Sequence, residues 1–597
     1  MQILRAYFYL FGRHRWAYAL GGGCLLLSNG LALAIPRVLG WAVDALGQGT
    51  TRSVLIGYGG TIMALAVVQT VTRVGSRVWV LSASRRIDYQ LKGMMHDHLM
   101  RLAPSFFSAV STGDLMSRMT NDIMLVRALG GPGVLYFFNA VLLYVMGLAF
   151  MMTINWRLAL IVFAPLPLMA WFVRGLVQKA KEYATGSRVA LADLNTMVQE
   201  NLAGVQVVKS FALEEAQGRH FDDLSTIYVG WNLKEAMTRA KMVPLVGLSG
   251  GIAILAVLGI GTRMVADGSL TLGDVVAFFS YIGMLVFPTV ALGWILSLIQ
   301  RGAAALERLD AVLKAPITIS SPPESRTTLP TPAAVQAQGL TFRYDDSKAA
   351  YRSILGSGRE DEGSRRAALQ DVDFEAEAGS FVGLVGKVGS GKSTLLKAII
   401  RLVEVPAGSI SLDEIDLTDL DLDGLRRRIG YVPQDDFLFS SSLAANIAYG
   451  KREASAEEIE EAAQIAGLMS DLARMPAGLD TMVGERGLTL SGGQRQRVAL
   501  ARAILPAPAI MVLDNALSNV DSDTERRILD RLHRSRRQCT LIVASNRIGA
   551  VRDADRIYVM DMGRVVDVGR HEELIRRPGL YADMHERQKL SAELERL

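Results

Sequence analysis

The chain contains very little cysteine and carries little net charge for its length. Only Cys24 and Cys539 occur among its 597 residues, one in an apolar stretch and the other in the charged second half. Two cysteines so placed provide neither a disulfide framework nor the paired spacing of a zinc site. The net charge of +5 is not concentrated in a dense basic run, so nucleic acid is not expected among the partners.

Carboxylates are absent from six long apolar stretches in the first half of the chain. Half of all residues are hydrophobic and the mean hydropathy is +0.25, which is high for a water-soluble protein. A bilayer core requires about 20 apolar residues per helix, so these stretches predict an α-helical membrane domain over residues 1–313. Ala32–Ala34 resembles a signal-peptide cleavage site, but the apolar run around it is too long for a signal peptide. The six transmembrane spans are expected at about 17–35, 54–72, 128–156, 157–174, 242–262 and 275–300.

The lack of intramembrane charge bears on the transported compound. Charged residues inside a membrane normally mark an ion pathway, so their absence argues against proton coupling and favours a small hydrophobic or amphipathic substrate. Asn29, Gln69 and Asn139 are the polar side chains that stand out within the spans. They either line a pathway or hold neighbouring helices together through hydrogen bonds, and the sequence leaves both interpretations open.

Two connections between the spans are long, charged and helical in composition. Residues 73–127 and 174–241 contain many Arg and Lys residues, which favours a position on the cytoplasmic side of the membrane. If each connection folds as two helical extensions, they project roughly 35 Å beyond the bilayer at about 1.5 Å per residue. Rods of this length are not self-supporting, so their tips are expected to contact something in the cytoplasm.

A proline-rich segment separates the apolar half of the chain from the charged half. Residues 314–334 carry several prolines among Ser and Thr, which predicts a linker between domains. Residues 335–597 alternate strand-like runs with helical stretches, a pattern typical of an α/β domain. Within it, residues 345–366 are rich in Gly, Ser and charge, and we interpret them as a solvated loop of unassigned function.

A glycine-rich loop that ends in Lys-Ser follows the strand-like run Phe381–Val385. The backbone N–H groups of such a loop, together with the N-terminus of the helix after it, bind phosphate groups. Lys392 would reach the β- and γ-phosphates, and the Ser393 hydroxyl would ligate Mg²⁺. The predicted ATP-binding residues are Gly386, Lys387, Val388, Gly389, Ser390, Gly391, Lys392, Ser393 and Thr394.

Two further motifs complete the predicted nucleotide chemistry. Asp514 ends the buried strand-like run Ile510–Asp514, a position suited to holding Mg²⁺ through water. A serine followed by two glycines begins a second helix, whose N-terminus is another anion-binding site. One nucleotide cannot easily use both helix ends of one domain, but two head-to-tail domains can enclose it between them. This second motif consists of Leu490, Ser491, Gly492, Gly493 and Gln494.

With these motifs the chain resembles, over essentially its whole length, a half-transporter of the ABC exporter superfamily. Tyr344 matches the aromatic residue that stacks on adenine, and Gln434 matches the glutamine that senses Mg²⁺ and the γ-phosphate. Val483–Gly487 resembles the loop before the signature motif, while Thr112–Arg118 and Gly204–Phe211 resemble two intracellular loops. The resemblance implies ATP and Mg²⁺ as cofactors, a multi-pass position in the lipid bilayer of a bacterial cell membrane, and a cytoplasmic ATP-binding domain. It also implies that the loop tips are coupling helices, the second of which docks on a partner's ATP-binding domain.

The chain departs from the family pattern at the catalytic positions. The family has a glutamate as general base after Asp514 and a switch histidine further on, whereas this chain has Asn515 and Asn546. Ser518–Asp521 keeps only the ends of the usual Ser-Ala-Leu-Asp. An asparagine can orient a water but cannot accept its proton, and the loss of a general base costs about 10²–10⁴ in rate. We therefore expect a site that holds ATP and hydrolyses it slowly. The residues at its catalytic positions are Gln434, Asp514, Asn515 and Asn546, and those expected at Mg²⁺ are Ser393, Gln434 and Asp514.

These departures leave several interpretations of the assembly. The preferred one is a heterodimer, in which the signature motif of this chain completes a competent site on a second half-transporter subunit. The alternatives are a homodimeric exporter with low ATPase activity, an engineered ATP trap, and a regulatory or channel-like subunit that uses ATP binding alone. In the preferred interpretation the chain is part of an ATP-hydrolysing exporter that moves drugs or lipids out of the cytoplasm or the inner leaflet.

Overall fold

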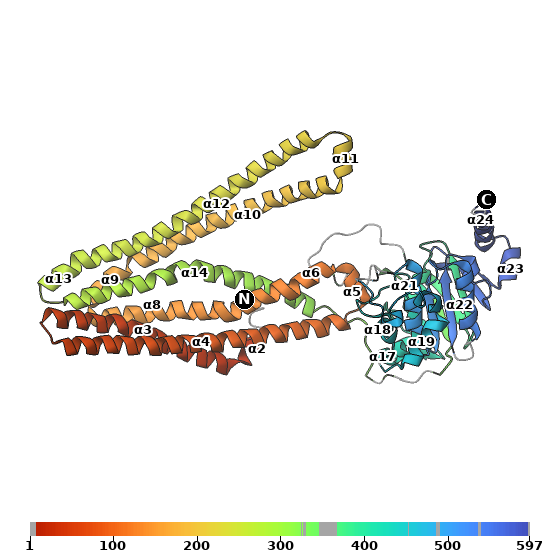
Figure 1. The fold of residues 1–597 in the computed structure, drawn as a ribbon, viewed down its shortest axis with the longest axis horizontal. Helices are drawn as coiled ribbons and strands as arrows, with labels where there is room; N and C mark the ends of the chain where they lie inside the picture. The colour runs from red at the N-terminus through yellow and green to blue at the C-terminus, as the bar shows by residue number, and fades with distance from the viewer. Residues whose placement is uncertain are drawn as a thin grey trace. The chain divides into compact units, whose positions relative to one another are not determined.

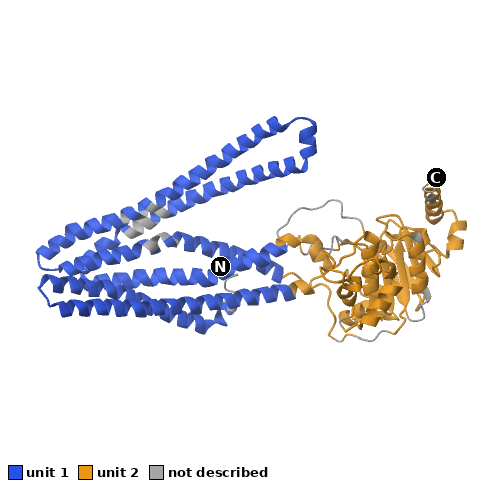
Figure 2. Ribbon diagram, viewed as in Figure 1, with its two compact units in different colours: residues 1–97, 115–313 blue, residues 98–114, 314–597 orange. Residues whose placement is uncertain are grey.

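The computed structural model describes residues 8–323, 325, 330–344, 351, 367–451, 453–484, 487, 490–534 and 539–594. Contacts divide the chain into two compact units, shown in different colours in Figure 2. The first unit comprises residues 1–97 and 115–313, and the second comprises residues 98–114 and 314–597. Each unit is described by itself.

The first unit is built of helices. They are α2 (Phe8–Gly12), α3 (Arg15–Gly47), α4 (Arg52–Arg101), α6 (Thr112–Ser117), α7 (Ile123–Ala128), α8 (Val134–Ile154), α9 (Trp156–Phe163), α10 (Pro165–Ala203), α11 (Val205–Ser210), α12 (Glu214–Ala256), α13 (Thr262–Ala266) and α14 (Leu272–Leu313). Among the described residues, three helical segments are long and apolar enough to cross a membrane, namely Arg15–Gly47, Arg52–Arg101 and Thr112–Ile154. Shorter apolar helical stretches lie at Gly250–Ala266 and Leu272–Val286.

Helices α3 and α14 pack together through two facing glycines. A Cβ atom added at Gly273 would overlap the backbone of Gly40, so neither position has room for a side chain. This close approach lets the Asp44 carboxylate accept a hydrogen bond from the backbone N–H of Gly273 at 2.7 Å, and Arg37 forms an ion pair with Asp274. Small residues at such a crossing are typical of helix packing in membranes, where backbones approach closely.

Two of the polar side chains noted in the predicted spans pair with each other. The amide nitrogen Nδ2 of Asn29 on α3 donates to Oδ1 of Asn139 on α8 at 3.2 Å. Asn29 is buried, so without this partner its amide would be unsatisfied in an apolar environment. Of the two interpretations left open by the sequence, the structure supports the joining of helices for this pair.

Helices α10 and α12 run side by side as a long antiparallel pair, and α11 closes the pair at one end (Figure 1). Gly186 allows the contact, because a Cβ atom there would lie 2.8 Å from the ring of Trp231. None of the residues of α11 is buried. Val207 is 57% exposed and Phe211 is 72% exposed, so the tip presents apolar side chains to its surroundings.

The end of the segment Thr112–Arg118, which resembles an intracellular loop, and the nearby Asp122 contact α14, the last helix of this unit. Arg308 on α14 donates two hydrogen bonds to the Asp122 carboxylate, at 2.9 and 2.5 Å. Arg118 in turn donates to the backbone carbonyl of Arg308 at 2.9 Å. Because Arg118 and Asp122 are both buried, this paired, charge-assisted contact holds the motif rigidly on α14.

The second unit is an α/β domain with two sheets. A four-stranded sheet has the order β2-β1-β4-β5, and a six-stranded sheet has the order β10-β9-β3-β8-β7-β6. The strands are β1 (Val335–Phe342), β2 (Leu369–Ala376), β3 (Phe381–Gly386), β4 (Ile410–Leu412), β5 (Ile415–Asp416), β6 (Ile429–Val432), β7 (Ile510–Asp514), β8 (Thr540–Ser545), β9 (Arg556–Asp561) and β10 (Arg564–Gly569). Every residue of β3, β7 and β8 is buried, as expected for parallel strands covered on both faces.

Helices surround these sheets and form the rest of the second unit. They are α5 (Pro104–Ala109), α16 (Lys392–Ile399), α17 (Leu422–Arg428), α18 (Leu443–Ala448), α19 (Ala456–Ile465), α20 (Met469–Leu472), α21 (Gly492–Ile504), α22 (Ser522–Arg534), α23 (His571–Arg576) and α24 (Leu580–Leu594). A helical first unit followed by an α/β unit is the arrangement that the sequence predicts.

Candidate functional site

The predicted site residues follow four neighbouring parallel strands. In the sheet β3 pairs with β8, β8 with β7, and β7 with β6, all in parallel register. The carboxyl ends of parallel strands meet at one edge, which is where α/β sheets bind ligands. The chain leaves β3 at the phosphate loop, β6 toward Gln434, β7 at Asp514 and Asn515, and β8 at Asn546. The fold therefore gathers residues from four distant parts of the sequence.

The phosphate loop has the backbone shape that its glycines permit. Gly389 and Gly391 have φ angles of +83° and +103°, in the left-handed region that favours glycine. At Gly386 a Cβ atom would overlap the backbone carbonyl of Met560. Lys387 and Val388 are exposed at the outer part of the loop, whereas Ser390 is buried. The loop thus presents its backbone to a ligand, with helix α16 beginning directly behind it.

Lys392 is folded back onto its own loop. Its ammonium group donates to the carbonyls of Gly386 and Lys387 at 2.8 and 2.9 Å and to the Ser390 hydroxyl at 3.3 Å. Burial lowers the pKa of Lys392 from 10.5 to about 8, and the nearby Asp514 opposes the shift only in part. The lysine is therefore a poorly solvated cation, which a bound phosphate would stabilise.

Ser393 and Asp514 form the candidate magnesium site. The Ser393 hydroxyl donates to Oδ1 of Asp514 at 2.8 Å. Burial raises the pKa of the Asp514 carboxyl, and the hydrogen bond from Ser393 acts against that shift. A hydroxyl and a carboxylate beside a phosphate loop are the oxygen donors that Mg²⁺ takes in nucleotide sites, so these residues fit the ion. Bound between Ser393 and Asp514, Mg²⁺ would supply positive charge that offsets the cost of the buried carboxylate.

Tyr344 lies beside the start of α16. Its hydroxyl and the Thr394 hydroxyl are 3.2 Å apart, within hydrogen-bonding distance. Its ring packs edge-on against Phe342, with ring centroids 5.0 Å apart. These contacts place the predicted adenine-stacking aromatic next to the phosphate loop.

The two unusual asparagines occupy adjacent strand ends. Asn515 follows β7 with a φ of +51°, a conformation that asparagine tolerates better than most residues. Its backbone N–H donates to the carbonyl of Ala544 on β8 at 2.8 Å. Asn546 follows β8, and its backbone carbonyl accepts a hydrogen bond from Gln588 at 2.7 Å. Both asparagines are half-buried, so each remains partly accessible at the end of its strand.

The signature motif is built around the N-terminus of α21. Ser491 caps the helix: its hydroxyl accepts from the backbone N–H of Gln494, while the Gln494 side chain accepts from the backbone N–H of Ser491. Leu490 is buried just before the cap. At Gly493 a Cβ atom would lie 2.7 Å from the carbonyl oxygen of Asn519. Such a reciprocal cap leaves helix N–H groups free for an anion.

The altered loop Ser518–Asp521 lies against this signature rather than apart from it. Gln496 of α21 donates to the Ser518 hydroxyl at 3.0 Å and accepts from the backbone N–H of Asn519 at 2.9 Å. The Asn519 amide also lies beside the backbone of Gly492. The sequence departure at Asn519 is therefore part of the surface that the signature presents.

Two polar groups near the strand ends were not singled out from the sequence. The Tyr431 hydroxyl and one carboxylate oxygen of Asp436 are buried and have no hydrogen-bond partner among the described residues. Burial raises the pKa of the Tyr431 phenol and raises the pKa of Asp436 from 3.8 to about 7. The available signal was their position around Gln434, with Tyr431 inside the strand β6 and Asp436 shortly after its end.

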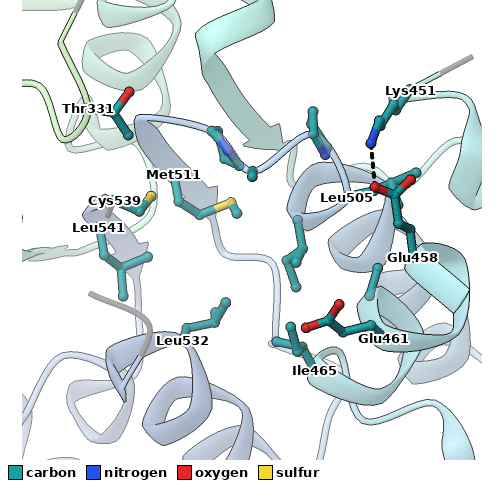
Figure 3. Close-up of a pocket in the computed structure, with 15 residues that line it drawn as sticks. Thr331, Lys451, Glu458, Glu461, Ile465, Leu505, Met511, Leu532, Cys539 and Leu541 are labelled. Atoms are coloured by element: carbon teal, nitrogen blue, oxygen red, sulfur yellow. Dashed lines mark hydrogen bonds and ion pairs between the residues drawn. The ribbon is translucent and has the colours of Figure 1, made fainter. Parts of the chain in front are cut away.

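Another cavity of the second unit, of about 380 Å³, differs from this site in its chemistry. Figure 3 shows Leu505, Met511, Leu532, Cys539 and Leu541 around it, with the ion pair of Lys451 and Glu458 at one side. Burial raises the pKa of the Cys539 thiol to about 12, so it remains protonated. None of the predicted nucleotide-binding residues lines this cavity.

Parts of the linker and of two further sequence predictions fall outside the described residues. In the linker 314–334 these are residues 324 and 326–329. In the loop Val483–Gly487 these are Glu485 and Arg486, and in the insertion 345–366 they are all residues except Tyr351. Tyr351 is fully buried, and its hydroxyl donates to the carbonyl of Pro316 at 3.1 Å.

Comparisons with known proteins agree with the geometry of both units. Residues 18–289 match the family described as "ABC transporter transmembrane region", and residues 369–518 match "ABC transporter". The chain is 36% identical to the multidrug resistance-like ATP-binding protein MdlA of Escherichia coli (strain K12), over 98% of this chain and 96% of that protein. It is 29% identical to an ATP-dependent lipid A-core flippase of Syntrophus aciditrophicus (strain SB), over 98% and 95% of the two chains.

A solved structure is similar over nearly the whole chain as well. It is a bacterial Atm1-family ABC exporter with ATP bound, with a TM-score of 0.76, 25% sequence identity, and coverage of 96% of this chain and 98% of that chain. The predicted resemblance, the fold class, the cofactors ATP and Mg²⁺ and the cytoplasmic ATP-binding domain are thereby confirmed. The chain belongs to the ABC transporter family, as an exporter half-transporter in which a multi-pass helical membrane domain is fused to an ATP-binding domain.

Proposed function

We propose that this chain is the degenerate-site subunit of a heterodimeric exporter. Its own phosphate loop holds ATP and hydrolyses it slowly, while its signature motif completes a competent site on a second half-transporter subunit. Residues 335–597 form the ATP-binding domain, 314–334 the linker, and 1–313 the membrane domain with six spans.

The observation that carries this proposal is the contrast between the binding groups and the catalytic groups. The bond of Lys392 to its own loop and the bond from Ser393 to Asp514 support phosphate and Mg²⁺ binding. The neighbouring strand ends, in contrast, carry Asn515 and Asn546. An amide has no basicity with which to take a proton from the attacking water. Binding is therefore retained where hydrolysis is impaired.

The signature motif supports the second half of the proposal. Ser491 and Gln494 form a complete reciprocal cap, and Gly493 lets the loop at Asn519 approach the start of the helix closely. Leu490–Gln494 keeps the residues of the family's signature motif, whereas the catalytic positions carry Asn515 and Asn546. An intact signature beside an impaired catalytic set is useful only if the signature acts on a nucleotide held by another subunit.

The exposed tip at α11 provides a contact for that subunit. Val207 and Phe211 leave an apolar surface at the end of two long helices, and large exposed apolar groups of this kind mark interaction sites. In this proposal α11 is the second coupling helix and docks on the partner's ATP-binding domain, so that closure of the two ATP-binding domains tilts the membrane helices outward.

The cargo is proposed to be an apolar or amphipathic compound, either a drug or a lipid. The predicted spans lack carboxylates, and the hydrogen-bonded pair Asn29 and Asn139 joins helices instead of offering a charge. The similar proteins named for multidrug resistance and for lipid A-core flipping favour the same class.

A pair of single substitutions tests the asymmetry directly. In the complex purified with its natural partner, Lys392→Ala should leave most of the ATP turnover, because it weakens only the slow site. Ser491→Ala should reduce turnover by at least about tenfold, since the loss of one group that stabilises transition-state charge typically costs about 10²–10³. Equal losses for both variants, or a purified complex whose native mass is two copies of this chain, would refute the heterodimer.

A further inference from the structure

A cavity of about 500 Å³ in the first unit is separate from the ATP chemistry. It lies among the short helix α2, the first turns of α3, the middle of α4 and the start of α8. Its volume is within the range of about 300–1,000 Å³ usual for small-molecule sites. It is therefore large enough for a ligand of appreciable size.

The wall of this cavity offers almost no free polar groups. The Tyr18 hydroxyl donates to the carbonyl of Gly130 at 2.9 Å, and the Ser76 hydroxyl donates to the carbonyl of Arg73 at 2.8 Å. Both hydroxyls are thus satisfied within the protein. Much of the remaining lining is apolar, including Leu25 and Phe138, so an occupant must be apolar along most of its length.

One cation lies at the mouth of this apolar cavity. Arg15, the first residue of α3, lines the cavity, is exposed and places its guanidinium over the ring of Trp16 at 5.8 Å. Within the part of the chain that the structure describes, no carboxylate pairs with Arg15. A guanidinium in this position can bind a phosphate through two hydrogen bonds.

The length of the cavity matches one leaflet of a bilayer. Its lining runs along α3 from Arg15 to Leu25, a rise of about 15 Å at about 1.5 Å per residue. The hydrocarbon core of a bilayer is about 30 Å thick, so this distance equals the depth of one leaflet. Beside α3, helix α4 passes Val80 and reaches Arg85 and Arg86 toward its cytoplasmic extension. The mouth at Arg15 therefore lies at the cytoplasmic side.

We propose that this cavity binds an anionic phospholipid of the cytoplasmic leaflet. One acyl chain fills the apolar space toward Leu25, and the phosphate group pairs with Arg15. The bilayer supplies such lipids at this depth, and the single cation at the mouth selects those with net negative charge. None of the ATP-binding residues lines this site, and the proposal does not depend on the dimer proposed above.

The glycines of α3 provide a matched pair of variants. Gly22 lines the cavity, and a Cβ atom added there would meet no atom within 4 Å. Gly23 is equally open but does not line the cavity. Gly22→Leu therefore fills the cavity without a clash in the protein, while Gly23→Leu adds the same side chain elsewhere on the same helix.

The test uses the purified full chain in detergent, with phosphatidylglycerol or phosphatidylcholine added and retained lipid counted by native mass spectrometry. Wild-type protein should retain phosphatidylglycerol in preference to phosphatidylcholine. Arg15→Gln should weaken the retention of phosphatidylglycerol about fivefold, since one basic residue near an anionic surface is worth about that factor. Gly22→Leu should abolish it. Arg13 is exposed but does not line the cavity, so Arg13→Gln and Gly23→Leu should bind as wild type does.

Two results would overturn the proposal. One is equal retention of the two lipids by wild-type protein, a measurement that requires no variant to fold. The other is undiminished binding to Gly22→Leu, with its thermal unfolding temperature equal to that of Gly23→Leu. Neither measurement depends on ATP turnover or on the identity of a partner subunit. If the heterodimer proposal is refuted, the proposal of a lipid site is therefore unaffected.

Discussion

ATP binding should weaken as the pH rises above about 8, because of the state of Lys392. Burial lowers its pKa to about 8 in the free chain, and only the protonated ammonium attracts the β- and γ-phosphates. At pH 9 roughly one lysine in ten is charged, so ATP affinity should fall about tenfold for each pH unit above 8, or about 1.4 kcal/mol. A bound phosphate raises the lysine pKa, so binding near pH 9 should also take up a proton.

The lowered pKa of Lys392 also determines how the stability of the free domain changes with pH. The pKa of Lys392 is lower in the folded chain than the usual 10.5. The charged form of this lysine therefore destabilises the folded state. Between about pH 8 and 10.5 the unfolded chain binds more protons than the folded chain at this residue, so this contribution to stability rises with pH. Affinity for ATP and stability of the free domain should therefore change in opposite directions.

Isothermal titration calorimetry of ATP binding between pH 7 and 10, in buffers of different ionisation enthalpy, measures both the affinity and the proton uptake. Lys392→Arg keeps its charge throughout this range, so its affinity should lose the slope. Lys387→Ala removes an exposed lysine of the same loop and should retain the slope. A flat affinity profile up to pH 10 in the wild-type chain would refute the reasoning.

Other variants probe the surroundings of the site. Asp436→Asn should raise the melting temperature by a few degrees (about 1–2 kcal/mol) at pH 8 and less at pH 5, because a carboxyl with a pKa of about 7 destabilises the fold most where it is ionised. Asp435→Asn removes an exposed like charge that contributes to the same pKa shift, so it should stabilise the protein by less. Asp122→Asn should destabilise the detergent-purified protein by about 1–3 kcal/mol, because it loses the two hydrogen bonds from Arg308 to the carboxylate. Arg308→Lys should cost nearly as much, since lysine cannot form both bonds. An unchanged melting temperature in either variant would contradict this prediction. Asn515→Glu should raise ATP turnover at this chain's own site by up to about 10²–10⁴, because it restores a general base. The substitution should also cost about 1–2 kcal/mol of stability, since the backbone there has a φ of +51°. If phosphate release does not increase, a missing general base is not what limits this site.

Much of the nucleotide site could be predicted because its motifs are local. A phosphate loop needs glycines, a lysine and a serine in one short loop between a strand and a helix. The consecutive residues Gly386–Ser393 meet that requirement. The signature is local in the same way, since Ser491 and Gln494 cap their own helix. Asn515 and Asn546 could be recognised as departures because the resembled family has a glutamate and a histidine at these two positions.

Contacts between distant residues could not be predicted in this way. The sequence does not indicate that Asn29 pairs with Asn139, or that Arg308 binds Asp122, because helix rotation and crossing geometry determine which polar groups face each other. The burial of Asp436 depends likewise on tertiary packing: α21 packs against β6 and carries Arg495 and Arg502, whose charges act on this carboxyl.

By itself, the sequence determined the order of the two domains, the membrane character of the first and the phosphate chemistry of the second. Apolar length, glycine placement and helix capping act within a few residues, so they can be read along the chain. Only the tertiary structure decided the pKa of Lys392, the pairing of Ser393 with Asp514, and the apolar cavity below Arg15. Each of these arises from desolvation or from contact between separate elements, and such effects exist only once the chain is packed.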